Sequence, residues 1–157
     1  MANQVNALQN NHIHLRPDVR EAILATSDEY ILSRQALFKP QLIFATEWVQ
    51  NNIKESDGDI VRLMGWASLG TSWFAHILGM FIVTDQKFIF VRDDSKAHAT
   101  KHPIQIFERS SMSDVEVGPA SGGWKQVSFI YNGQRHSLER IHKDNATKIV
   151  SLLRSKQ

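Results

Sequence analysis

Histidine is the residue type in this sequence that could bind a metal ion or exchange a proton near neutral pH. The chain has seven histidines and no cysteine, which excludes thiolate nucleophiles and Cys-ligated zinc or iron–sulfur sites. His98 and His102 have the spacing of one helix face, but the polar residues 93–103 are typical of a loop. No carboxylate stands at a recognisable ligand spacing. The sequence therefore predicts ordinary surface or partly buried histidines, at positions 12, 14, 76, 98, 102, 136 and 142, and no metal site.

Carboxylates and nucleophile motifs give no catalytic set either. Glu55, Asp57 and Asp59 form an acidic turn with a glycine, but the turn lacks the further ligands of an EF-hand calcium loop. Asp93 and Asp94 are adjacent, so on an extended chain their side chains point apart. There is no Gly-x-Ser-x-Gly elbow, phosphate-binding loop or dinucleotide fingerprint. We predict a protein that is not an enzyme, with no catalytic residue, no cofactor-binding residue and no cofactor.

Residues 69–78, Leu-Gly-Thr-Ser-Trp-Phe-Ala-His-Ile-Leu, are strongly apolar at a point where the pattern requires a turn between two β-like runs. Two interpretations of Trp73 and Phe74 stay open at this point. Residues 75–78 could begin the second strand while Trp73 and Phe74 pack on the N-terminal helices as core. Alternatively, the two aromatic residues form a contact between subunits, because Trp and Phe are enriched in interface cores.

The composition indicates a globular chain with little electrostatic bias. Its 157 residues are 42% hydrophobic, and 18 Lys and Arg against 16 Asp and Glu give a net charge of +2. A nucleic-acid partner is not expected, because such proteins carry a clear excess of basic residues. The polar start is unlike a secretory signal, and the apolar run at residues 73–83 is too short to span a bilayer. We therefore expect a cytoplasmic protein.

The first third of the chain is predicted to be an arm followed by helices. Residues 1–16 lack a sustained period and are expected to form a flexible arm. Residues 17–54 form a helical extension that begins near Pro17, and Pro40 is expected to end or kink its first element. A second helix from Gln41 has apolar residues at three-and-four spacing: Leu42, Ala45, Trp48, Val49 and Ile53.

The remainder of the chain changes to a strand-like period. Short runs rich in β-branched and aromatic residues occupy residues 60–66, 80–84, 87–91, 104–107, 112–117, 126–131 and 134–138. Asp85-Gln86 and Asn132-Gly133 predict tight hairpins between neighbouring runs. A final helix, capped by Asp144 or Asn145, carries one apolar face. About six or seven antiparallel strands between helices predict an α+β fold, with residues 17–157 as one domain.

The order of these runs resembles a known family. Residues 79–91, Gly-Met-Phe-Ile-Val-Thr-Asp-Gln-Lys-Phe-Ile-Phe-Val, are similar to the "G-hydrophobic-T-[DN]-x-[KR]-hydrophobic" hairpin of bacterial pleckstrin-homology-like (PH-like) domains, the YokE-like group. Residues 112–117 resemble the "I-x-D-I-x-x-V" segment of the same group, with the last valine one position early. The resemblance covers about residues 60–155, and the helices of residues 17–54 have looser parallels there.

The resemblance implies a partly open antiparallel barrel of about seven strands, with a C-terminal helix that plugs one end through Ile149, Val150 and Leu153. It supplies no catalytic residue. In lipid-binding members the loop at residues 69–78 approaches the membrane, so Trp73 and Phe74 could insert as a wedge beside basic residues. The basic candidates are Arg62, Lys87 and Arg92, with Lys96 and Lys101 in the next loop. The loop itself has no Lys or Arg, a departure from the phosphoinositide-binding pattern.

Two hypotheses for function follow. The first is a non-enzymatic binding or assembly module, whose apolar surface comes from Trp73, Phe74 and the N-terminal helices and meets a protein partner or a second copy. The alternative is a peripheral membrane module on the inner membrane face, which binds anionic lipid through Trp73 and Phe74 with Arg62, Lys87 and Arg92 nearby. A second basic set around the final helix could touch anionic lipid or nucleic acid, or could be a solvated helix face: Arg135, Arg140, Lys143, Lys148, Arg154 and Lys156.

Overall fold

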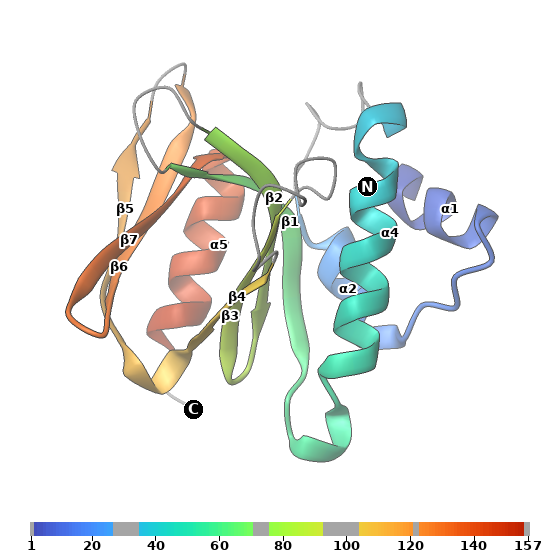
Figure 1. Ribbon diagram of the computed structural model, residues 1–157, viewed down its shortest axis with the longest axis horizontal. Helices are drawn as coiled ribbons and strands as arrows, with labels where there is room; N and C mark the ends of the chain where they lie inside the picture. The colour runs from blue at the N-terminus through green and yellow to red at the C-terminus, as the bar shows by residue number, and fades with distance from the viewer. Residues whose placement is uncertain (1, 27–34, 71–75, 93–103, 121–122, 156–157) are drawn as a thin grey trace.

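Seven antiparallel strands form one sheet in the computed structural model, which describes residues 2–26, 35–70, 76–92, 104–120 and 123–155 (Figure 1). The strands are β1 (Val61–Gly70), β2 (His76–Thr84), β3 (Lys87–Arg92), β4 (Ile104–Glu108), β5 (Met112–Pro119), β6 (Lys125–Tyr131) and β7 (Gln134–Ile141). Their order across the sheet is β4-β3-β2-β1-β7-β6-β5, so the pairing of β1 with β7 joins two local meanders. With helix α5 (Lys143–Arg154) after the last strand, this is the predicted α+β, PH-like architecture.

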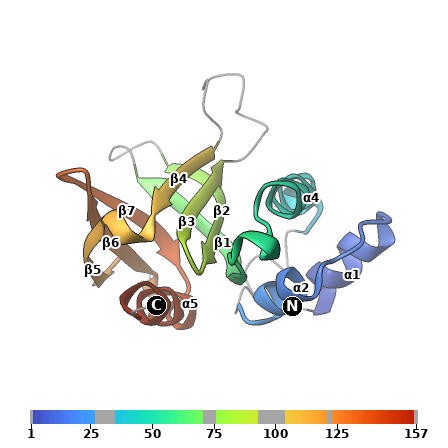
Figure 2. The same cartoon turned by 90° about the horizontal axis from the view of Figure 1, so that it is seen from below.

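The inner face of the sheet and α5 enclose one of two apolar cores. Phe88 and Phe90 alternate along β3, point inward and are 1% exposed. Ile149 and Val150 enter the same core from α5, and Leu153 packs against it. Figures 1 and 2 show α5 with β5–β7 on one side and β1–β4 on the other. The predicted plug by these three residues of α5 is confirmed.

The N-terminal helices cover the outer face of the sheet and form the second core. These helices are α1 (Ala2–Asn10), α2 (Pro17–Leu24) and α4 (Gln35–Asn52), and a short 3₁₀ helix, η1 (Glu55–Asp57), leads into β1. Figures 1 and 2 place them on the side of β1–β3 that faces away from β5–β7. The core contains outward-facing strand residues and the apolar faces of the helices, among them Val19, Ile23, Leu42, Ala45, Val49, Met64, Met80, Ile82 and Ile89.

Two expectations about the N-terminal region are wrong. Residues 1–16 do not form a flexible arm throughout, because α1 docks on the outer core with Val5 3% and Leu8 0% exposed. Pro40 does not end its element, and no separate helix begins at Gln41, because α4 begins at Gln35 and continues past both residues. The first four N–H groups of a helix have no intrahelical partner in any case, so a proline in the second turn removes about one further backbone bond.

The tight turns follow the predictions, whereas the cap of the last helix does not. Asn132 and Gly133 have φ of 52° and 76°, as the two central residues of a type I′ hairpin require. The N-cap of α5 is His142, whose Nδ1 accepts a hydrogen bond from the backbone N–H of Asp144 at 3.2 Å. The predicted caps, Asp144 and Asn145, therefore lie inside the first turn of the helix.

Candidate functional site

Trp73 and Phe74, the aromatic pair of the predicted binding loop, lie outside the described residues. The strands on either side of them are longer than expected. β1 continues through Gly70 and β2 begins at His76, and these two residues pair across the strands. Residues 69, 70 and 76–78 therefore belong to strands, as the core interpretation predicted for 76–78, and the connection narrows to residues 71–75.

Two of the predicted basic residues, Arg62 and Lys87, lie near the β2–β3 hairpin, and each binds a carboxylate. Arg62 donates from Nε and Nη2 to the two carboxylate oxygens of Asp85 at 2.7 and 3.0 Å, and this hydrogen bonding raises the pKa of Arg62. Lys87 Nζ lies 3.2 Å from Oδ2 of Asp59, whose side chain is 3% exposed. Because both cations already have carboxylate partners, this end of the sheet offers little net positive charge to an anionic ligand.

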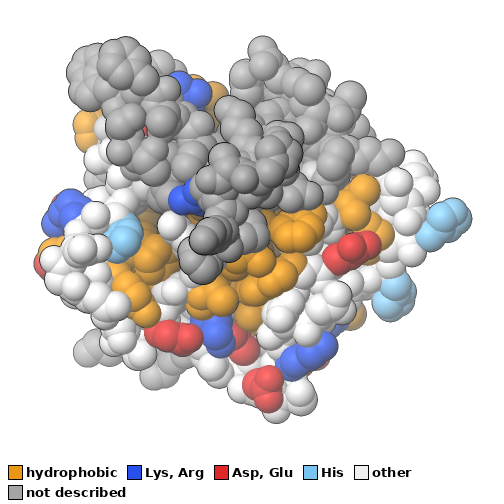
Figure 3. Space-filling view, in the orientation of Figure 1, with side chains coloured by type: hydrophobic (Ala, Val, Ile, Leu, Met, Phe, Trp, Pro, Cys, Tyr) orange, Lys and Arg blue, Asp and Glu red, His pale blue; other side chains and the backbone are white. Residues whose placement is uncertain are grey.

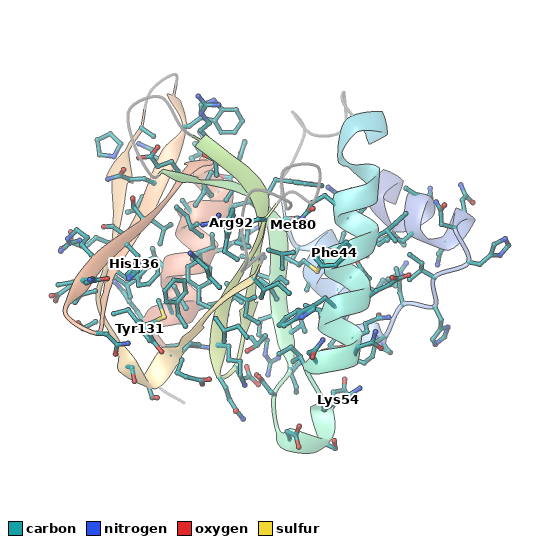
Figure 4. The ribbon with its side chains drawn as sticks, in the orientation of Figure 1. Phe44, Lys54, Met80, Arg92, Tyr131 and His136 are labelled. Carbon is teal, nitrogen blue, oxygen red and sulfur yellow. The ribbon has the colours of Figure 1, made fainter. Side chains whose placement is uncertain are left out.

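Arg92 lies at the other end of β3 from Lys87, about 16 Å away at the rise of an extended strand. Strand alternation places its side chain on the inner face, with Phe88 and Phe90 (Figure 4). Its Nε is buried and has no hydrogen-bond partner among the residues the structure describes. Arg62, Lys87 and Arg92 therefore do not form one basic site.

Three of the six residues of the second basic set make structural contacts, and Lys156 lies outside the described residues. Arg154 donates from Nε and Nη2 to the carbonyl of Val115 at 3.0 and 2.7 Å, which ties α5 to β5. Lys148 donates to the carbonyl of Ala25 after α2. Arg135 donates to a serine hydroxyl on the neighbouring strand β6. These side chains link elements of the fold and do not present one continuous basic face.

An apolar strip remains on the outer surface between α4 and β4, and we call it the α4–β4 strip: Phe44, Trp48, Ile104 and Ile106. The first three are half-buried against the outer core, whereas Ile106 is 44% exposed. Ile106 pairs across the strands with Ile89, which is completely buried. Figure 3 shows hydrophobic side chains gathered in the middle of this face, and Figure 4 shows Phe44 on the side of α4 toward the sheet. The strip is thus the exposed margin of the outer core.

Strand β4 is an edge of the sheet, with β3 as its neighbour among the described strands. The N–H of Arg109, directly after β4, donates to the carbonyl of Gln86. In an antiparallel strand, successive residues direct their backbone N–H and C=O groups to opposite sides of the strand. Phe107, two residues before Arg109, therefore also directs its N–H and C=O toward β3. Ile106 and Glu108 then direct theirs toward the free edge. Ile106 therefore combines an exposed side chain with outward-facing backbone groups.

A cluster of rings fixes the lower end of β4 against β6 and β7. The ring of Phe107 lies 5.1 Å from that of Tyr131 and 5.0 Å from that of His136, both in edge-on geometry. Figure 4 shows Tyr131 and His136. The N–H of Glu108 lies 3.5 Å from the hydroxyl of Tyr131. These contacts occupy the end of the strand and leave the edge open at Ile106. The sequence predicted a strand at Ile104 and Ile106. Periodicity alone did not show which face of this strand stays exposed to solvent.

Two further observations concern ligands and membranes. Across the described ranges, no group of three or more His, Asp or Glu side chains is placed to hold a metal ion. None of the helices in the described part of the chain is long and apolar enough to cross a bilayer.

Comparisons with known proteins give structural similarity alone. No family model matches the sequence, and no curated protein sequence matches it. One similar solved structure is the C-terminal domain of an unknown protein from Leishmania infantum, with a TM-score of 0.47 and 10% identity, covering 64% of this chain and 90% of that one. Another is the hSac2 domain of the human phosphoinositide phosphatase Sac2, with a TM-score of 0.45 and 12% identity, covering 71% of this chain and 79% of that one.

Proposed function

We propose that this chain is a non-enzymatic binding module that contacts protein through the α4–β4 strip and the free edge of β4. The observation that carries the proposal is Ile106, which is 44% exposed in the middle of an edge strand. An extended segment added to this edge would satisfy the outward backbone groups and bury the side chain at the same time. Exposed edges are commonly protected by charged residues or proline, and an isoleucine in this position favours pairing.

The occupant that we propose is a second copy of the chain, paired by antiparallel contact of β4 with β4. A two-fold axis at Ile106 sets this residue opposite itself, Ile104 opposite Glu108, and Gln105 opposite Phe107. This register brings no like charges directly opposite one another, and it places the two Ile106 side chains in contact. The α4–β4 strips of the two copies would flank the new pair of strands.

The membrane alternative has less support. Arg62 and Lys87, two of the basic residues it needs, are bound to Asp85 and Asp59. Its wedge residues lie outside the described part of the chain. Binding to anionic vesicles that is reversed by salt would favour this alternative, because salt screens contacts between exposed charges and head groups.

Sedimentation velocity over a range of concentrations tests the proposal, with Ile106→Lys as the variant. Val117→Lys is the matched control, because Val117 is 41% exposed on the opposite edge strand, β5. We expect a concentration-dependent dimer for the unchanged protein and for V117K, and a monomer for I106K with unchanged circular dichroism. A peptide copying residues 103–109 should compete with the dimer. A protein that stays monomeric at every concentration, or equal loss of dimer in both variants, would contradict β4 pairing.

A further inference from the structure

The connection between α1 and α2 forms an open groove of about 400 Å³. This groove shares no residue with the α4–β4 strip, and it is lined by Gln9, His12, Ile13, His14, Leu15 and Arg20. Ile13 and Leu15 are half-buried and pack against the outer core, whereas His12, His14 and Arg20 are exposed. Figure 3 shows histidine side chains at the right-hand edge of the molecule, over the α1–α2 connection. The groove thus has an apolar floor and a rim of basic groups.

The backbone at His12 indicates that this imidazole has a role of its own. The N–H of His12 donates to the carbonyl of Gln9 at 3.0 Å, and the N–H of Ile13 donates to that of Leu8 at 3.2 Å. These two bonds are the Schellman motif that ends α1, and they place His12 at the left-handed position, with φ of 60°. Glycine is the usual residue there because it has no Cβ. A histidine at this strained position, on the rim of a groove, points to binding by its side chain.

The rest of the groove is held in place before any ligand arrives. The Gln50 side chain donates to the carbonyl of His14 at 2.9 Å and accepts from the backbone N–H of Arg16 at 2.8 Å. Arg16 in turn binds the Asp18 carboxylate and the carbonyl of Ile53. Because these contacts order residues 14–16, a ligand would not have to order them on binding.

The charges around the groove favour an anion. α1 carries no charged residue, and no carboxylate lines the groove. In the described parts of the connection, α2 and α4, the charged or titratable residues are these: His12, His14, Arg16, Asp18, Arg20, Glu21, Lys39 and Glu47. Arg16 and Asp18 bind each other, and Arg20 makes a long contact of 3.9 Å with the exposed carboxylate of Glu21.

We infer that this groove binds a small organic anion, a carboxylate or a phosphate monoester that carries an apolar group. The Arg20 guanidinium binds the charged group by a charge-assisted hydrogen bond, and the rings of His12 and His14 donate further hydrogen bonds to it. Ile13 and Leu15 contact the apolar part. This site is independent of the protein contact proposed above and uses a different surface.

Titration of the full chain with three probes, followed by NMR of the histidine rings, tests the inference. Phenyl phosphate and benzoate represent the two sources of the anion, and inorganic phosphate lacks the apolar group. His12→Gly and Arg20→Gln are the variants, and Lys143→Gln is the control that removes an exposed positive charge elsewhere. His12→Gly supplies the residue that the left-handed position prefers, so loss of binding in this variant would not arise from unfolding.

We expect saturable shifts of the His12 and His14 ring signals with phenyl phosphate, benzoate or both, and the tighter probe identifies the source of the anion. Binding should be about tenfold weaker in H12G and R20Q, and unchanged in K143Q. The inference is wrong if neither organic probe gives saturable shifts, or if H12G binds as the unchanged protein does. Inorganic phosphate that binds as tightly as phenyl phosphate would also overturn it, because the apolar floor would then contribute nothing.

Discussion

Arg109 connects the β2–β3 turn to the end of α5, and its replacement should lower the free energy of unfolding. It lies in the 3₁₀ helix η3 (Arg109–Ser111) between β4 and β5. Its Nη1 donates to the carbonyls of Thr84 and Asp85 at 2.8 and 3.0 Å, and its Nη2 donates to the carbonyl of Leu152. Burial lowers the pKa of Arg109, and nearby carboxylates partly offset this effect. Nη2 also lies 3.4 Å from the carbonyl of Ser155, so one guanidinium serves four backbone acceptors at the β2–β3 turn and the end of α5.

The expected loss of stability on replacing Arg109 can be estimated from these hydrogen bonds. A hydrogen bond from a charged donor contributes about 1.5–3 kcal/mol, and water can replace part of it at a half-buried site. Arg109→Met keeps most of the volume and removes every donor, so we expect the free energy of unfolding to fall by about 3–5 kcal/mol. Arg109→Lys keeps the charge but cannot reach the turn and the helix together. We expect it to cost about half as much.

Urea unfolding at pH 7, followed by circular dichroism and by tryptophan fluorescence, measures this difference. Arg20→Met is the control, because its side chain is 49% exposed and a surface change of this kind usually costs less than about 0.5 kcal/mol. A loss below about 1 kcal/mol in R109M would show that these hydrogen bonds are exchanged for water at little cost. Equal stability of R109K and the unchanged protein would refute the argument that one planar group must serve both elements.

Two further changes test the packing of the outer core and of the sheet. Burial of the Asp18 carboxylate opposes its ionisation, but the hydrogen bond from Arg16 and the N–H at the start of β1 outweigh burial and lower the pKa of Asp18. The resulting stability is present above the ordinary carboxyl pKa and is lost as the pH falls through the lowered value. Urea midpoints should therefore decrease more steeply below about pH 4 in the unchanged protein than in Asp18→Asn. A parallel pH profile in the two proteins would contradict this role. Gly79→Ala should cost about 3 kcal/mol or more, because its Cβ would lie 2.2 Å from the carbonyl oxygen of Val91. The control Gly118→Ala meets only a flexible glutamine side chain and should change the thermal midpoint little, so equal effects of the two alanines would contradict the steric argument.

Local rules predicted the parts of the fold that local chemistry determines. Asn132-Gly133 specifies a type I′ turn by itself, and the positive φ at both residues agrees with it. The spacing of Ile149 and Val150 specifies the buried face of α5 regardless of what covers it. The α+β order and the closing helix could therefore be predicted from the sequence.

Less of the candidate site could be predicted from the sequence, because the site depends on contacts between residues that are distant in the sequence. Lys87 and Asp59 are 28 positions apart, and only the fold brings them together as an ion pair. The sequence therefore offered Lys87 as a candidate for binding anionic lipid and did not show its partner. His142 illustrates a second limit, since its ring becomes the N-cap of α5 although helix-start rules favour Asp144. Tertiary packing also makes α1 a helix, because Val5 and Leu8 are buried on docking.

The extent of the helical layer explains why the proposed contact lies at β4. Ile89 and Ile106 are the same residue type, pair directly across β3 and β4, and lie on the same face of the sheet. Ile89 is completely buried and Ile106 is 44% exposed. This difference in exposure arises because the N-terminal helices cover Ile89 and do not cover Ile106. The N-terminal helices bury the outer face of β1–β3 and leave the margin of the outer core uncovered at the edge strand. A second copy that extends the sheet at β4 would cover this margin and satisfy the outward backbone groups of Ile106, whereas a contact through β5 would leave both exposed.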